Sequence, residues 1–192
     1  SKGYLNAELK IDNVCIKEKE MEVRGINVTE FNEVELLLRD SFTETEYGYQ
    51  GEAELVKKIR AEKTYNPELE LVAVEEYQVV GHTLLSEVAV GEGENNTGLA
   101  LAPIAVRPGL QNKGIGTALI REAEVRAKNL GYYYISILGS PEYYGKFGYQ
   151  PASEFGITAP FEVPDEAFLV KALELDALEN VSGVLRYTKA FG

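Results

Sequence analysis

Residues 98–106 read Gly98-Leu-Ala-Leu-Ala-Pro-Ile-Ala-Val106, and the chain continues as Arg107-Pro-Gly-Leu-Gln-Asn-Lys-Gly-Ile-Gly116. The first half is a nearly continuous apolar run, which is typical of a central strand covered on both faces. Pro108-Gly109 ends this strand. Beyond the loop, apolar residues recur at helical spacing as far as Leu130. The stretch therefore predicts a buried strand that runs through a glycine-bearing loop into a helix.

The chemistry of this loop follows from its glycines and from the helix that it opens. Gly114 and Gly116 lack a Cβ atom, so the backbone can turn sharply and come close to a ligand. The first amides of a helix have no partner inside it, and together with the helix dipole they form an anion site. Gln111 adds a neutral donor and Lys113 adds a positive charge. We expect the loop to bind a pyrophosphate; the alternative is a glycine turn that only closes a strand–helix connection.

The rest of the chain alternates between strand and helix patterns around this unit. The expected strands lie at residues 21–28, 69–75, 79–90, 98–106, 132–138, 168–175 and 183–187, and the expected helices at 31–42, 52–61, 115–130 and 141–147. This order predicts an α/β (α+β) fold with a mixed central sheet flanked by helices. We expect one domain over residues 21–192, preceded by an extension over residues 1–20. The extension is vector-derived, peripheral or a real N-terminal arm, and the sequence leaves these alternatives open.

Composition and charge narrow the class of protein. The 192 residues carry a formal net charge of −12, which disfavours a nucleic-acid partner because such proteins present a basic face. The acidity either attracts cationic molecules and basic peptides or only keeps the protein in solution. Cys15 is the single cysteine, so no internal disulfide can form, and neither a membrane span nor a secretory signal is evident. We expect a cytoplasmic protein with no membrane partner and no metal, since no residues have metal-ligand spacing.

Two motifs together resemble a known family. Gln111-Asn-Lys-Gly-Ile-Gly116 resembles the Gln/Arg-x-x-Gly-x-Gly/Ala signature of the GNAT acetyltransferases. Tyr143-Tyr-Gly-Lys-Phe-Gly-Tyr149 resembles the Tyr-x-Lys-Leu/Phe-Gly-Phe segment of the same family. The motifs occur in the family's order, about 30 residues apart, and the resemblance covers roughly residues 21–192. Segments 138–141 and 181–187 are similar to the bacterial YhbS-type subgroup.

The resemblance implies a fold and a cosubstrate. In the GNAT fold the fourth and fifth strands splay apart, and the pantetheine arm of acetyl-CoA lies between them. The backbone of Ile104, Ala105 and Val106 would bind that arm, and the pyrophosphate would be bound by Gln111, Asn112, Lys113, Gly114, Ile115, Gly116 and Thr117. Residues 138–141 read Leu-Gly-Ser-Pro where many members carry an asparagine that contacts CoA. The resemblance does not extend to this contact.

Acyl transfer to an amine needs a polarised thioester carbonyl and a proton for the leaving thiolate. Val106 follows the expected bulge of the fourth strand, and we expect its free backbone N–H to polarise the carbonyl. Tyr144 is the expected general acid and also a cofactor contact, since a phenol with a pKa of about 10 stays protonated at neutral pH. The alternative is that its ring only packs against CoA. Tyr143, Phe147 and Tyr149 are expected in the core.

The base that deprotonates the amine is less evident from the residues. Glu87 on the third strand and a chain of water molecules are equal candidates. His82 is the only histidine of the chain, and the usual pKa of a histidine would suit a base. Because it lies beside Gly81 in an alternating strand, we expect it to be structural instead. Cys15 lies outside the matched region and has no partner histidine, so a thiol nucleophile is not expected.

The acceptor site is expected in the loop between the first two helices, where family members bind their acceptors. Its candidate residues are Glu44, Glu46, Tyr47 and Tyr49; a solvated loop is the alternative. The leading function is the transfer of acetyl from acetyl-CoA to a primary amine of a small molecule or peptide, in a ternary complex that aligns the reactants. Two rivals are a catalytically silent CoA-binding sensor or interaction module and a generic nucleotide binder. The residues do not identify the acceptor, and they leave a homodimer open.

Overall fold

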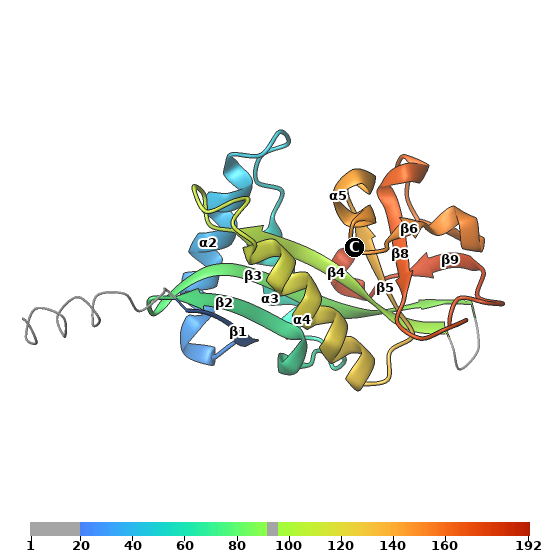
Figure 1. Cartoon of the computed structure of the whole chain (residues 1–192), viewed down its shortest axis with the longest axis horizontal. Helices are drawn as coiled ribbons and strands as arrows, with labels where there is room; N and C mark the ends of the chain where they lie inside the picture. Colours follow the sequence, from blue (N-terminus) through green and yellow to red (C-terminus); the bar gives the residue numbers. More distant parts are fainter. Residues whose placement is uncertain (1–19, 92–95) are drawn as a thin grey trace, which may run out of the picture.

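The computed structural model describes residues 20–91 and 96–192. Cys15 and all but the last residue of the expected extension lie outside these ranges. Within them, nine strands form a mixed sheet in the order β1-β2-β3-β4-β5-β8-β6, with β9 paired to β3 and β7 paired to β9 (Figure 1). The strands are β1 (Met21–Gly25), β2 (Glu70–Glu75), β3 (Gln78–Val90), β4 (Thr97–Val106), β5 (Tyr134–Leu138), β6 (Gln150–Pro151), β7 (Ile157–Thr158), β8 (Phe168–Ala172) and β9 (Gly183–Arg186).

Every expected strand is present, and the expected mixed α/β sheet is confirmed. β1 to β4 pair antiparallel, whereas β4 and β5 pair parallel. The strands β6 and β7 were not expected, because two residues are too few to show an alternation of apolar and polar side chains.

Helices cover both faces of the sheet. They are α2 (Phe31–Thr43), α3 (Glu52–Arg60), α4 (Ile115–Asn129) and the short α5 (Pro141–Gly145). Figure 1 shows α4 lying across the near face of the sheet. On that face α4 packs against Leu85, Leu99 and Leu101, whereas α2 and α3 pack on the opposite face against Leu84 and Ala105.

An apolar stripe along α4 packs the helix against the sheet. Ile115, Leu119, Ile120, Ala123 and Ala127 are all buried, as their spacing predicts. Burial of each larger side chain stabilises the fold by about 1.5–3 kcal/mol. The loop that precedes the helix is therefore held in one position relative to β4.

A third apolar cluster joins the far part of the sheet. It contains Ala100 of β4, Tyr134 of β5, Val170 of β8 and Leu185 of β9. Gly98 is required there, because a Cβ atom at this position would lie 2.3 Å from the Tyr134 ring. The cluster holds the first halves of β4 and β5 side by side.

The second halves of β4 and β5 separate. Their parallel pairing covers only Leu99 with Ile135 and Ala100 with Ser136, while β5 pairs with β8 along its full length. β4 itself stays on β3, with a register shift between Thr83 and Leu85 that marks a bulge. The expected splay of the fourth and fifth strands is thus confirmed.

Candidate active site

The loop between β4 and α4 is built from residues that tolerate a left-handed backbone. Gly109 and Gly114 both have φ of 85°, and Asn112 has φ of 63°. The Gly109 N–H donates to Gln111 Oε1 at 2.9 Å, which closes the loop on itself. Gly114 is the N-cap of α4. The amides of the first turn of α4 therefore stay available to an anion.

A pocket of about 410 Å³ adjoins this loop. Its lining is Val106, Leu110, Gln111, Asn112, Gly114, Ile115, Gly116, Thr117 and Tyr143. Most of the residues expected to bind the cosubstrate thus come together, while Lys113 is exposed and outside the lining. A Cβ atom on Gly116 would lie 3.0 Å from the Tyr143 hydroxyl and 3.9 Å from Val106 Cγ2. The glycine keeps this space open.

The second half of β4 turns backbone amides toward the gap left by β5. The Arg107 N–H donates to the Val80 carbonyl at 2.8 Å, and hydrogen-bonded pairs alternate with non-hydrogen-bonded ones along an antiparallel ladder. In the register of β3 and β4, Val106 and Ile104 are therefore the non-hydrogen-bonded positions. Their N–H groups point away from β3, into the gap.

Ser41 of α2 reaches the same edge. Its hydroxyl donates to the Val106 carbonyl at 3.0 Å, across 65 residues of sequence. This bond ties the end of α2 to the end of β4. Sequence reasoning missed Ser41, because a serine in an amphipathic helix carries no signal about a distant partner.

Tyr144 lies on the β5 side of the gap, opposite the free amides of β4. Its ring packs against Gly139, where a Cβ atom would lie 2.4 Å from the Tyr144 ring. Gly139 directly follows β5, three residues beyond the last residue that pairs with β4. Burial, and to a lesser degree the neighbouring Tyr143, raise the pKa of Tyr144 to about 12. The phenol is therefore protonated throughout the neutral range.

The expectation that Tyr143 belongs to the core is wrong. Tyr143 is 38% exposed and its hydroxyl lies beside Gly116 in the loop pocket. It stands edge-on to Tyr144, with ring centroids 5.0 Å apart. Phe147 and Tyr149 are buried, as expected. The two tyrosines are neighbours in the short helix α5, so their side chains point in different directions. The sequence alone could not show which of them faces the pocket.

Glu87 lies away from the free amides. It pairs with Leu99, seven residues from Val106, which corresponds to about 23 Å along a strand. It lines a separate pocket with Arg186 and Tyr187. The structure therefore does not bring the expected base together with the expected N–H donor.

His82 is fully buried in a network of charged groups. Its Nε2 lies 2.9 Å from Glu70 Oε2, and Glu70 also accepts hydrogen bonds from Arg60 at 2.6 Å and from Tyr65 at 2.7 Å. This burial and pairing agree with the expected structural histidine. However, His82 Nδ1 has no hydrogen-bond partner among the residues that the structure describes.

The expected acceptor residues occupy different environments. Glu46 and Tyr47 are exposed, and the Tyr49 hydroxyl donates to Glu54 while its ring faces Arg39 at 5.0 Å. Glu44 lines a pocket of about 520 Å³ between α2 and the exit of β4. The full lining is Glu33, Leu36, Leu37, Asp40, Thr43, Glu44, Val79, Arg107 and Pro108.

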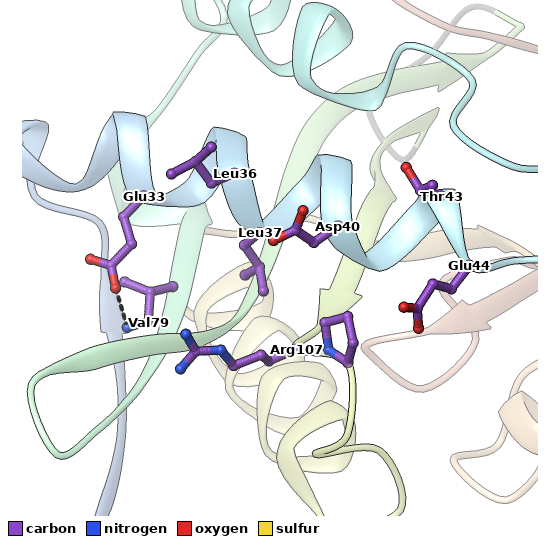
Figure 2. A pocket seen from close by; sticks show the side chains of 9 residues that line it. Glu33, Leu36, Leu37, Asp40, Thr43, Glu44, Val79 and Arg107 are labelled. Carbon is purple, nitrogen blue, oxygen red and sulfur yellow. Dashed lines mark hydrogen bonds between the residues drawn. The ribbon is translucent and has the colours of Figure 1, made fainter.

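Figure 2 shows which elements line this second pocket. Glu33, Asp40 and Glu44 extend from α2, and Arg107 lies on the opposite wall. Glu33 already has a partner within the protein, because its Oε1 accepts a hydrogen bond from the Val79 N–H at 2.8 Å. The pocket thus places carboxylates of α2 next to the strand exit that carries the free amides.

Two kinds of site are not found in the described part of the chain. No group of three or more His, Cys, Asp or Glu side chains there is arranged to hold a metal ion. None of its helices has the length and apolar character needed to cross a membrane.

Comparison with known proteins places this geometry in a family. Residues 32–149 match the Acetyltransferase (GNAT) family. The chain is 31% identical over 159 residues to the uncharacterized N-acetyltransferase YhbS of Escherichia coli (strain K12), covering 82% of this chain and 90% of that protein. It is 35% identical over 123 residues to the uncharacterized N-acetyltransferase YjhQ of the same organism, covering 62% of this chain and 67% of that protein.

Two solved structures have the same fold. The crystal structure of YhbS from Escherichia coli in complex with CoA superposes with a TM-score of 0.81 at 29% identity, covering 91% of this chain and 93% of that one. A GNAT family acetyltransferase from Brucella melitensis in complex with acetyl-CoA gives a TM-score of 0.74 at 28% identity, covering 91% of this chain and 100% of that one. With the loop, the splayed strands and these similarities together, the chain belongs to the GNAT family of N-acetyltransferases.

Proposed function

We propose that this protein binds acetyl-CoA along the free edge of β4 and transfers its acetyl group to a primary amine within a ternary complex. The observation that carries the proposal is that the free amides of β4 and the glycine loop follow one another along the same strand exit. The N–H groups of Ile104 and Val106 face the gap, and the same strand ends at the glycine loop and its pocket. Two similar structures were solved with CoA or acetyl-CoA.

The residues present fit such a cosubstrate. The amides from Gln111 to Thr117 surround a pocket that a side chain at position 116 would fill, and a pyrophosphate suits the start of α4. Backbone groups of Ile104 and Val106 would bind the pantetheine arm, whereas the N–H of Ala105, which was also expected to contribute, faces β3. Lys113 is exposed beside the loop and supplies positive charge without being buried.

The two banks of the gap offer the groups that acyl transfer needs. On the β4 side of the gap, the N–H group of Val106 would donate to the carbonyl oxygen as negative charge develops on it. On the β5 bank, the protonated Tyr144 would donate to the leaving sulfur. Glu44 lines the pocket at the strand exit, and it is the acceptor-side residue that we favour among the four expected ones.

A second candidate is a CoA-binding module without transferase activity. Two observations favour it: residues 138–141 lack the asparagine that many family members carry, and Glu87 lies far from the free amides. Binding and turnover separate the two functions. We expect acetyl-CoA at 100 times Kd to stabilise the fold by about 2.7 kcal/mol, and acetyl-CoA to be consumed when primary amines are added. Stabilisation without turnover across a panel of polyamines, amino acids, aminoglycosides and peptides would favour the silent module.

A further inference from the structure

The buried pair of His82 and Glu70 has a defined proton arrangement. Glu70 receives Arg60 Nε at 2.9 Å and Arg60 Nη2 at 2.6 Å, and the Tyr65 hydroxyl at 2.7 Å. Burial alone would raise the pKa of Glu70, but hydrogen bonds from His82, Arg60 and Tyr65 outweigh it and lower that pKa to about 2. An ionised carboxylate only accepts hydrogen bonds. His82 Nε2 therefore carries the hydrogen, and Nδ1 carries a lone pair.

The lone pair on Nδ1 is not used by any residue that the structure describes. His82 is 0% exposed, and Nδ1 has no hydrogen-bond partner among the described residues. Buried polar atoms are nearly always hydrogen-bonded, to protein or to an ordered water, because leaving one unpaired costs about 1–3 kcal/mol. Nδ1 is thus an acceptor whose partner does not come from these residues.

The position of His82 in the sheet relates it to the gap. His82 pairs with Ala105, which lies between the two residues whose N–H groups face the gap. Neighbouring strands are about 5 Å apart, so the backbone of His82 lies one strand from the open edge of β4, while its Nε2 is turned to Glu70 of β2. On the His82 face of the sheet the intervening side chain is a single methyl group. Glu87, in contrast, pairs with Leu99, where β4 still pairs with β5.

The charged groups around His82 favour a neutral ring that can be protonated transiently. β2 contributes Glu70, α3 contributes Arg60 and the segment after α3 contributes Tyr65. β4 contributes Ala105, and α2 contributes apolar side chains to the same cluster. Burial lowers the pKa of His82, and Glu70 partly offsets this effect. The ring is neutral at pH 7, and Glu70 would stabilise an imidazolium formed during the reaction.

We propose that His82 Nδ1 receives, through bound water, the proton that the amine acceptor loses during acetyl transfer. This inference rests on the proposed function. The amine nitrogen forms a bond to the acetyl carbon, and the carbon–sulfur bond breaks. One N–H proton passes to the water, which gives a proton to Nδ1. The leaving sulfur takes a proton from Tyr144, and the imidazolium then restores that proton through solvent, so the enzyme ends unchanged. His82 is a positioning and relay residue for the water that touches the substrate.

The first test needs no acceptor, because His82 is the only histidine in the chain. The 15N resonances of its imidazole are therefore assigned without ambiguity in the full-length protein. We expect the neutral tautomer with the hydrogen on Nε2 at pH 7, and a pKa below the usual value. A hydrogen on Nδ1, or a ring charged at pH 7, would overturn the proposal whatever the protein catalyses.

The second test compares two substitutions that separate the two ring nitrogens. His82→Gln keeps a donor for Glu70 but removes the acceptor at Nδ1. His82→Asn keeps an acceptor near the Nδ1 position but loses the donor to Glu70. A relay predicts that Gln lowers kcat by about 10²-fold and more than Asn does, while the Kd of acetyl-CoA stays unchanged. A structural histidine predicts the reverse order, because Gln preserves the bond to Glu70.

The pH profile provides a readout that does not depend on either variant folding. In the wild-type enzyme, the acidic limb of kcat/KM should fall at the pKa that the 15N titration gives for His82. A mismatch between the two values would refute the relay, as would a Glu87→Gln variant that loses this limb. If the wild-type protein binds acetyl-CoA but acetylates no amine, the proposed function fails and the relay fails with it. Turnover with an unchanged His82→Gln variant refutes the relay alone.

Discussion

The loop at residues 107–117 and the segment at residues 41–54 flank the same strand exit, but they are built in different ways. The loop offers backbone amides, held by glycines with left-handed φ and by the N-terminus of α4. The segment offers side chains: Ser41 on the Val106 carbonyl, Glu44 in the second pocket, and Tyr49 on Glu54. A backbone site requires the absence of side chains, whereas a side-chain site requires particular ones in particular places.

This difference extends to the chemistry proposed on the two faces of the sheet. Backbone amides do not titrate, so the loop should respond to steric change more than to pH. The α2 and α3 face contains Glu70 and His82, buried groups whose protonation does change with pH. A bulky side chain in the loop therefore tests the backbone site, whereas acid tests the buried groups on the α2 and α3 face.

The largest effect is expected from added atoms in the loop. Gly116→Val would place a Cβ atom 3.0 Å from the Tyr143 hydroxyl and add two methyl groups beside the pocket that we propose for the pyrophosphate. We expect the Kd of acetyl-CoA to rise about a thousandfold, or about 4 kcal/mol, in calorimetric titration. Gly25→Ala is the matched control, because a Cβ atom there meets only ordinary contacts at 3.6 Å. Normal affinity in a folded Gly116→Val protein would place the anion site elsewhere.

Acid should destabilise the face of the sheet that α2 and α3 cover. The pKa of Glu70 is lowered to about 2 in the folded protein, so its contribution to stability is present above pH 4.5 and is lost as the pH falls toward 2. The lowered pKa of His82 acts in the same direction, since the unfolded chain takes up its proton first as the pH falls. We expect Glu70 to account for a loss of about 3 kcal/mol between pH 5 and pH 2. Urea unfolding at several pH values measures it, and a Glu70→Gln variant with an equally steep acid slope would contradict the assignment.

Tyr144→Phe removes one hydroxyl and keeps the ring on Gly139. We expect kcat and kcat/KM to fall together by about 10²-fold, or about 2.7 kcal/mol, while acetyl-CoA affinity is retained. Steady-state kinetics with an active amine measures the change. Tyr143→Phe is the informative comparison, because the Tyr143 hydroxyl lies in the loop pocket instead. A larger loss of kcat in Tyr143→Phe would exchange the roles of the two tyrosines.

The smallest effect is expected at Lys113. Its side chain is exposed and lies outside the pocket lining, so solvent screens its attraction for a pyrophosphate. We expect Lys113→Ala to weaken acetyl-CoA binding about threefold, or roughly 0.7 kcal/mol, and the difference to shrink in 1 M salt. A loss as large as that of Gly116→Val would mean that charge, and not the backbone, dominates the loop.

The linear sequence by itself determined the seven longer strands, the helices and the glycine loop. Alternating apolar residues and the Gly114-Ile-Gly116 spacing encode local backbone geometry, and local geometry is what short patterns specify. The motif from Tyr143 to Tyr149 indicated where the second bank of the gap lies. It did not indicate which tyrosine faces the pocket, because that depends on how α5 packs against Gly139 and Gly116.

Only the tertiary structure decided which side chains meet. Ser41 reaches Val106 across 65 residues, Arg60 and Glu70 enclose His82, and Glu87 falls too far along β3 to join the free amides. Each outcome depends on strand register and on the packing of helices from distant parts of the chain. A shift of one residue in register would move every side chain of a strand to the opposite face, and no pattern within one segment contains that information.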